Sequence, residues 1–117
     1  METLTIYHNP RCGKSRAALA LLQERKVQLR VVEYLKIPPT RDDLATLRRK
    51  LGLAPSEWVR KSEAEYRSAG LDADSSEDKI LDAMAAHPIL IERPIVVRGK
   101  RAIVGRPPER VLELLKE

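Results

Sequence analysis

Apolar positions in the first third of the chain switch from strand-like to helix-like spacing and back. Residues 3–7 alternate weakly and predict a short strand, and residues 27–34 are β-branched and mostly apolar, which predicts a second strand. Residues 13–26, between them, favour a helix. One stripe of that helix would be formed by Ala18, Leu21, Leu22 and Arg25. This order indicates a right-handed βαβ unit with parallel strands.

The middle of the chain predicts only helices. Pro38-Pro39 stops regular structure, and Thr40 then begins a helix as its N-cap, with Asp43 completing a capping-box-like pattern and Gly52 ending it. Further helical segments are expected at 55–60, at 63–69 and from the N-cap Ser75 to His87-Pro88. The apolar side of the last one would be formed by Ile80, Leu81 and Met84. We therefore expect a helical insertion at about residues 40–87.

The last third returns to strands. The apolar runs 94–98 and 101–104 are separated by Gly99-Lys100, which predicts a hairpin with a type II′ turn. A final helix follows Pro107-Pro108, with Val111, Leu112 and Leu115 as its apolar side. The order βαβ, helical insertion, ββα predicts an α/β protein with a four-stranded mixed sheet, the thioredoxin-like arrangement, as a single domain over residues 1–117. Such folds commonly carry a cis-proline at the start of the third strand, where Pro94 stands.

Composition limits the functions to consider. The chain has 117 residues, 43% of them hydrophobic, no Phe, one Trp and a net charge of +5. That charge favours anionic partners but does not separate a small oxyanion from nucleic acid or an acidic protein. No apolar run approaches the roughly 18 residues of a membrane span. A single cysteine and no signal peptide predict a reducing cytoplasm, and any second thiol must come from another molecule.

The candidate chemistry lies at the turn from the first strand into the first helix, residues 7–16. Cys12, the only cysteine, stands where a helix N-terminus can stabilise negative charge and lower the pKa of a thiol. A structural cysteine would be buried among apolar groups, whereas the neighbours of Cys12 are polar or small. We therefore predict that Cys12 is a nucleophile in a loop that receives an oxyanion. The loop continues with Gly13, Lys14, Ser15 and Arg16, and Gly13 would let an anion approach the backbone N–H groups.

Two other anion-binding motifs fail on this stretch. A P-loop needs a glycine five positions before Gly13, where His8 stands. A phosphatase-type loop needs an arginine about six positions after the cysteine, where Ala18 stands. The run Cys12-Gly13-Lys14-Ser15 matches the spacing of a redox loop with serine in place of the second cysteine.

Three basic residues are candidates to assist Cys12. His8 is either a surface or turn histidine or, if it approaches Cys12 when protonated, a group that stabilises the thiolate. Arg93 and Arg106 flank the hairpin, next to prolines, at strand ends expected to approach the Cys12 loop. Planar guanidinium groups suit tetrahedral oxyanions because they donate paired hydrogen bonds.

The chain resembles the glutaredoxin-linked arsenate reductases, the ArsC family, over nearly its full length. Several separated motifs match in the right order. They are residues 6–12 with Ser15-Arg16, Tyr34-Leu35 before Pro38-Pro39, residues 87–91, residues 93–97 and residues 105–107. Because the chain stops soon after its last helix, it is most similar to the shorter chromosomal ArsC-like members.

The resemblance implies a single-cysteine arsenate reductase. In it Cys12 attacks arsenate, the arginines Arg60, Arg93 and Arg106 hold the oxyanion, and His8 lies near the thiolate. Glutathione, as co-substrate, adds to the Cys12–arsenic adduct, glutaredoxin reduces the mixed species, and arsenite leaves. We expect no bound cofactor and no metal, and no nucleic-acid or membrane partner, with the protein working as a monomer.

Two alternatives stay open. The first is a glutathione-dependent thiol reductase that does not use arsenate. The second is a regulator that binds RNA polymerase, like the related Spx proteins, although those usually carry a second cysteine where Ser15 stands.

Overall fold

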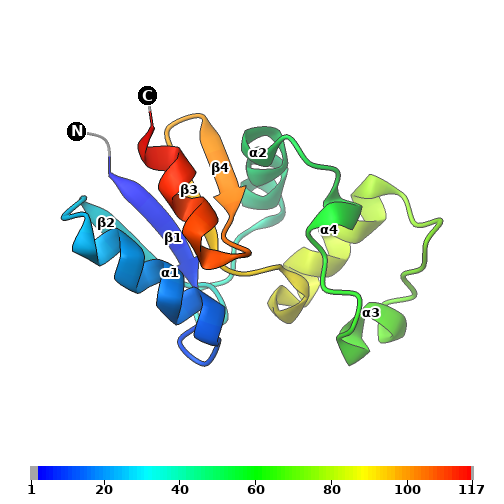
Figure 1. The fold of residues 1–117 in the computed structure, drawn as a ribbon. Coiled ribbons are helices and arrows are strands. Elements are labelled where there is room, and N and C mark those ends of the chain that lie inside the picture. Colours follow the sequence, from blue (N-terminus) through cyan, green and yellow to red (C-terminus); the bar gives the residue numbers. More distant parts are fainter. Residues whose placement is uncertain (1–2, 117) are drawn as a thin grey trace. The chain divides into compact units, whose positions relative to one another are not determined.

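The computed structural model describes residues 3–116, which form two compact units. The first unit combines residues up to 37 with residues from 93 onward, and the second consists of residues 38–92. Figure 1 shows the elements of both units, coloured along the chain. No helix among the described residues has the length and apolar character needed to cross a bilayer.

The first unit is built on a four-stranded mixed sheet. Its strands are β1 (Leu4–His8), β2 (Leu29–Glu33), β3 (Ile95–Arg98) and β4 (Arg101–Val104), in the spatial order β2-β1-β3-β4. β1 and β2 are parallel, and the other two pairings are antiparallel. The predicted mixed sheet is therefore confirmed.

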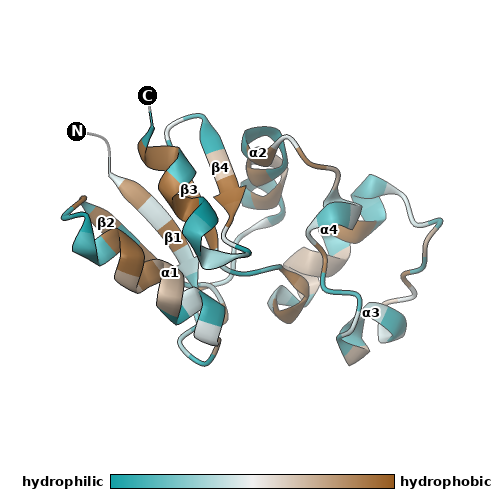
Figure 2. Cartoon of the chain, in the orientation of Figure 1, coloured by the Kyte–Doolittle hydropathy of each residue, from teal (hydrophilic) through white to brown (hydrophobic). Residues whose placement is uncertain are grey.

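Two helices cover the same face of this sheet. α1 (Gly13–Glu24) and the 3₁₀ helix η3 (Pro108–Leu115) lie side by side against it (Figure 1). Both helices contain hydrophobic residues, which are brown along their ribbons in Figure 2. The core they share consists of Leu4, Ile6, Ala18, Leu22, Val96, Val111 and Leu114. Each fully buried Val, Leu or Ile side chain of this core contributes roughly 1.5–3 kcal/mol, so these side chains fix the sheet against both helices.

Helix α1 is shorter than predicted. It ends at Glu24, since the N–H groups of Arg25 and Lys26 donate to the carbonyls of Leu22 and Gln23 and close the last turn. Lys26 then adopts a left-handed backbone with φ 56°. Arg25 is exposed, so it does not belong to the buried stripe, and β2 begins only at Leu29.

The hairpin turn confirms the prediction, but the last helix differs from it. Gly99 has a φ of 58° while Lys100 does not have a positive φ, as a type II′ turn requires. The final segment is a 3₁₀ helix with three residues per turn, which buries Val111 and Leu114. Leu112 and Leu115, placed on the apolar side by an α-helical spacing, are only half-buried.

The second unit is helical. Its elements are α2 (Arg41–Leu51), η1 (Pro55–Glu57), α3 (Ala64–Ser68), α4 (Glu77–Ala86) and η2 (Pro88–Leu90). The capping box that starts α2 is confirmed, with Thr40 and Asp43 each accepting the other's backbone N–H. Gly52 ends the helix with a φ of 66°, as predicted for a C-terminal glycine.

Helix α4 begins one residue later than predicted. Its N-cap is Ser76, whose hydroxyl accepts the N–H of Lys79 at 3.2 Å. Ser75 instead accepts the N–H of Asp72 at 2.9 Å within the preceding turn. The predicted apolar side is correct, because Ile80, Leu81 and Met84 are buried.

Candidate active site

A tight turn after β1 places Cys12. The carbonyl of Asn9 accepts the N–H of Cys12 at 3.0 Å, and the side-chain oxygen of Asn9 accepts the N–H of Arg11 at 3.0 Å. Asn9 is buried although it is polar. An Asn-Pro pair is a turn signal, and here Asn9 and Pro10 turn the chain from the sheet into α1.

Cys12 is the N-cap of α1 and is partly exposed. The first turn of α1 contains no acidic residue, so nothing in that turn offsets the positive end of the helix. Burial raises the pKa of the Cys12 thiol, but three groups outweigh it and hold the pKa below its usual value. These groups are the backbone N–H of Ser15, the Arg93 guanidinium and the backbone N–H of Lys14.

Ser15 is the centre of a buried hydrogen-bond network. Its side chain is fully buried, and its hydroxyl accepts the N–H of Asn9 at 3.0 Å and lies 2.6 Å from Nδ1 of His8. The hydroxyl has one proton and two lone pairs, so it pairs with His8 either by donating to Nδ1 or by accepting from it, according to the tautomer of the imidazole.

The surroundings of His8 bear on the two interpretations that the sequence left open. Burial lowers the pKa of His8, Glu33 opposes the shift and Arg16 adds to it, and the net shift is downward. The shift favours the neutral imidazole, whereas the thiolate-stabilising interpretation of His8 requires its protonated form. Through Ser15, His8 also contacts the loop whose backbone N–H groups lower the pKa of the thiol.

The other loop residues are exposed and line the approach to Cys12. Nη1 of Arg16 donates to the carbonyl of Pro10 at 2.9 Å, which ties the helix back to the turn. Lys14 and Gly13 are exposed. A Cβ added at Gly13 would meet only Nη2 of Arg16, at an ordinary 3.7 Å, so packing does not require glycine there.

Arg93 and Arg106 come together at the end of the hairpin in the same unit. Nη1 of Arg106 donates to the carbonyl of Arg93 at 3.3 Å, and the Arg93 guanidinium hydrogen bonds Cys12. Nε and Nη1 of Arg93 are buried. The Arg93-Pro94 bond is cis, and so is the Arg106-Pro107 bond, which the sequence did not single out.

Arg60 belongs to the second unit. Its guanidinium pairs with Glu63 at 2.5 Å and lies 4.0 Å from Glu92, and its backbone N–H donates to the carbonyl of Leu90 at 2.7 Å. Two carboxylates thus neutralise its charge in this arrangement.

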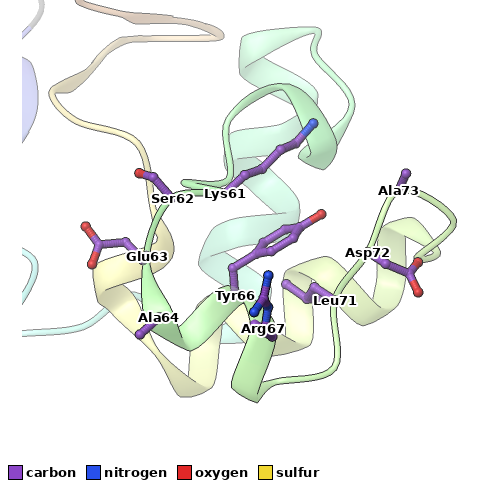
Figure 3. A pocket seen from close by; sticks show the side chains of 9 residues that line it. All are labelled: Lys61, Ser62, Glu63, Ala64, Tyr66, Arg67, Leu71, Asp72 and Ala73. Atoms are coloured by element: carbon purple, nitrogen blue, oxygen red, sulfur yellow. The ribbon is translucent and has the colours of Figure 1, made fainter.

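A half-open pocket of about 600 Å³ also lies in the second unit (Figure 3). Lys61 and Arg67 bring positive charge to its lining, and Glu63 and Asp72 bring negative charge. Because these charges balance, the lining does not favour an oxyanion. The described residues also contain no group of three or more His, Cys, Asp and Glu side chains that could hold a metal ion.

Sequence reasoning missed two parts of the site. The bridging role of Ser15 depends on its complete burial between β1 and α1, which local spacing does not reveal. The Asn-Pro pair signals a turn at Asn9, but it does not specify which N–H group the Asn9 side chain binds. Both residues act on the geometry around Cys12.

The fold and the site define a class, thioredoxin-like proteins that present one cysteine at a helix N-terminus. Residues 7–114 match the ArsC family. A Neisseria meningitidis protein named arsenate reductase is 45% identical, with 98% of this chain and 100% of the relative covered. One from Escherichia coli K12 is 41% identical, with 100% and 84% covered. The solved structure of a Vibrio cholerae arsenate reductase has a TM-score of 0.91 and 45% identity, with 96% and 97% covered. The chain belongs to the ArsC family.

Proposed function

We propose that this protein is an oxidoreductase that reduces arsenate to arsenite, with Cys12 as the nucleophile. The observation that carries the proposal is the contact of the Arg93 guanidinium with a Cys12 thiol at the N-terminus of α1. A thiolate and a site for a tetrahedral oxyanion are then in the same place. The arsenate reductases of N. meningitidis and E. coli, similar over this whole chain, support the choice of oxyanion.

The reaction starts with attack of the Cys12 thiolate on arsenic. A sulfur–arsenic bond forms, and one arsenate oxygen takes up protons and leaves as water. Glutathione then adds to the same arsenic, releasing a second water. The thiol of glutaredoxin attacks the glutathione sulfur, so that two thiols are oxidised to a mixed disulfide while arsenic gains two electrons. Water finally releases arsenite and frees Cys12.

Each basic residue of the site has its own role in this reaction. Arg93 binds the oxyanion beside Cys12, and Arg106, held to the Arg93 carbonyl, supplies a second guanidinium at the same strand ends. Arg60 is the third oxyanion ligand implied by the resemblance, and in that role it would exchange Glu63 and Glu92 for the substrate. His8 keeps the loop in place through Ser15.

The two units work as one domain, with the helical segment inserted into the thioredoxin-like part. The electrons come from glutathione and glutaredoxin because Cys12 is the only thiol of the chain. The protein needs neither a metal nor a bound cofactor, and it works as a monomer in a reducing cytoplasm.

The test is glutaredoxin-coupled oxidation of NADPH with arsenate, glutathione and glutathione reductase. The wild type should show an arsenate-dependent rate that is absent in Cys12→Ser. Arg93→Lys keeps the charge but loses the paired hydrogen bonds, so it should raise the KM for arsenate about tenfold or more. Arg25→Lys, an exposed arginine outside the site, is the matched control and should behave as wild type.

A folded wild-type protein without an arsenate-dependent rate would refute the proposal. Turnover of glutathione mixed disulfides by that same protein would then favour the thiol reductase.

A further inference from the structure

Gly105 lies where the two arginine segments of the first unit meet. It immediately precedes Arg106, and its N–H donates to the carbonyl of Pro94 at 2.8 Å, which adds one hydrogen bond beyond the Ile95–Val104 pair of the β3–β4 ladder. Nη1 of Arg106 donates to the carbonyl of Arg93 at 3.3 Å. Two hydrogen bonds thus tie the segment 105–106 to the segment 93–94.

Gly105 has no room for a side chain. An added Cβ would lie 2.8 Å from Cγ1 of Val111 and 2.9 Å from Cγ of Pro94. Neither neighbour can yield easily, because Val111 is a fully buried β-branched residue of the core and Pro94 is a buried ring. Gly105 does not have a positive φ, so its backbone conformation is open to other residues and the requirement for glycine is one of space.

We propose that Gly105 is a positioning residue of the oxyanion site, whose missing side chain lets Pro94 pack against the β4–η3 connection and so fixes Arg93 at Cys12. Any side chain at this position pushes Pro94 away, and Arg93, bonded directly to Pro94, moves with it. The inference deepens the proposed function, since the site concerned is the proposed arsenate site.

Gly105→Ala tests the proposal through the thiol itself. The rate of Cys12 alkylation against pH reports the thiolate without any arsenate. Because the Arg93 guanidinium helps to lower the pKa of Cys12, its displacement should reduce the alkylation rate near pH 6 about three- to tenfold. The KM for arsenate should rise while the expressed protein keeps its fold by circular dichroism.

A second variant separates positioning from stability. Adding Val111→Ala opens space on the other side of residue 105, which lets the new Cβ retreat from Pro94. The double variant should therefore melt at a lower temperature than Gly105→Ala, because it also leaves a cavity in the core. It should nevertheless recover the wild-type alkylation profile. If Gly105 had a purely structural role, the less stable double variant would deviate more from the wild-type alkylation profile than Gly105→Ala does.

Gly52→Ala is the matched control. Gly52 belongs to the other unit. Its φ is 66° and no atom lies within 4 Å of an added Cβ, so alanine at this position strains the backbone without causing a clash. It should lower the melting temperature and leave the alkylation profile unchanged.

The proposal is overturned if folded Gly105→Ala alkylates as wild type, or if the double variant is as slow as the single one. Should Gly105→Ala alone not fold, alanine and valine at position 105 are compared in the Val111→Ala background. Valine should then slow alkylation, alanine should not, and equal profiles overturn the proposal. If the wild type is inactive on arsenate, the proposed function is refuted. The alkylation results still test whether Gly105 positions Arg93 at Cys12, because they do not depend on arsenate.

Discussion

Replacing Ser15 by alanine should destabilise the protein strongly, although it removes a single oxygen atom. The hydroxyl is fully buried, and it satisfies the N–H of Asn9 and Nδ1 of His8. The variant leaves both groups without this partner among buried residues. Each buried unsatisfied group costs about 1–3 kcal/mol, so Ser15→Ala should lower the free energy of unfolding by about 2–6 kcal/mol. That is a large part of the roughly 5–15 kcal/mol of a typical domain.

Urea denaturation followed by circular dichroism measures this loss. Ser62→Ala is the matched control, because Ser62 is exposed and an exposed substitution should stay within about 0.5 kcal/mol of wild type. Ser15→Ala with an unfolding free energy equal to that of the control would refute the argument, since the hydroxyl would then not be the shared partner of Asn9 and His8.

Two further predictions concern a titration and a backbone conformation. The pKa of Cys12 is lowered in the folded state, so the unfolded chain binds its proton more tightly, and the free energy of unfolding should rise with pH up to about 8.5. This stabilisation is lost as the pH falls through the folded-state pKa, and urea titrations at several pH values should show the slope in wild type but not in Cys12→Ser. Lys26→Gly should stabilise by about 1 kcal/mol, because a left-handed backbone is costly for any residue with a Cβ. Thermal unfolding should show no such gain for Lys26→Ala, and equal melting temperatures for the two variants would contradict the reasoning.

The features that could be predicted are those with a local cause. Thr40 and Asp43 are three residues apart and cap α2 through their own backbone, and Gly99 supplies the positive φ that its hairpin turn requires. Strand and helix spacing then determines the order of elements, and with it the sheet. Cys12 could be placed at a helix N-terminus for the same reason, since the strand before it and the helix after it are both visible in the residue pattern.

The features that could not be predicted depend on packing between distant segments. The contact of Arg106 with the Arg93 carbonyl joins positions 13 residues apart through the whole hairpin. The two interpretations of His8 could not be separated from the sequence, because its burial, which lowers its pKa, and its contact with Ser15 arise only in the fold. The 3₁₀ geometry of η3 buries Leu114, three residues after Val111, in place of Leu115, because a periodicity of three replaces one of 3.6.

Two of the three groups that favour the charged sulfur are main-chain amides, those of Lys14 and Ser15. Any point mutation other than one to proline changes the side chain at either position but leaves its N–H in place. Part of the reactivity is therefore encoded by the path of the backbone and would survive the loss of Arg93, whereas the proposed choice of electrophile depends on guanidinium groups that one codon can replace. During evolution, proteins with this loop can therefore change their oxidised substrate by replacing arginines while they keep the same cysteine nucleophile.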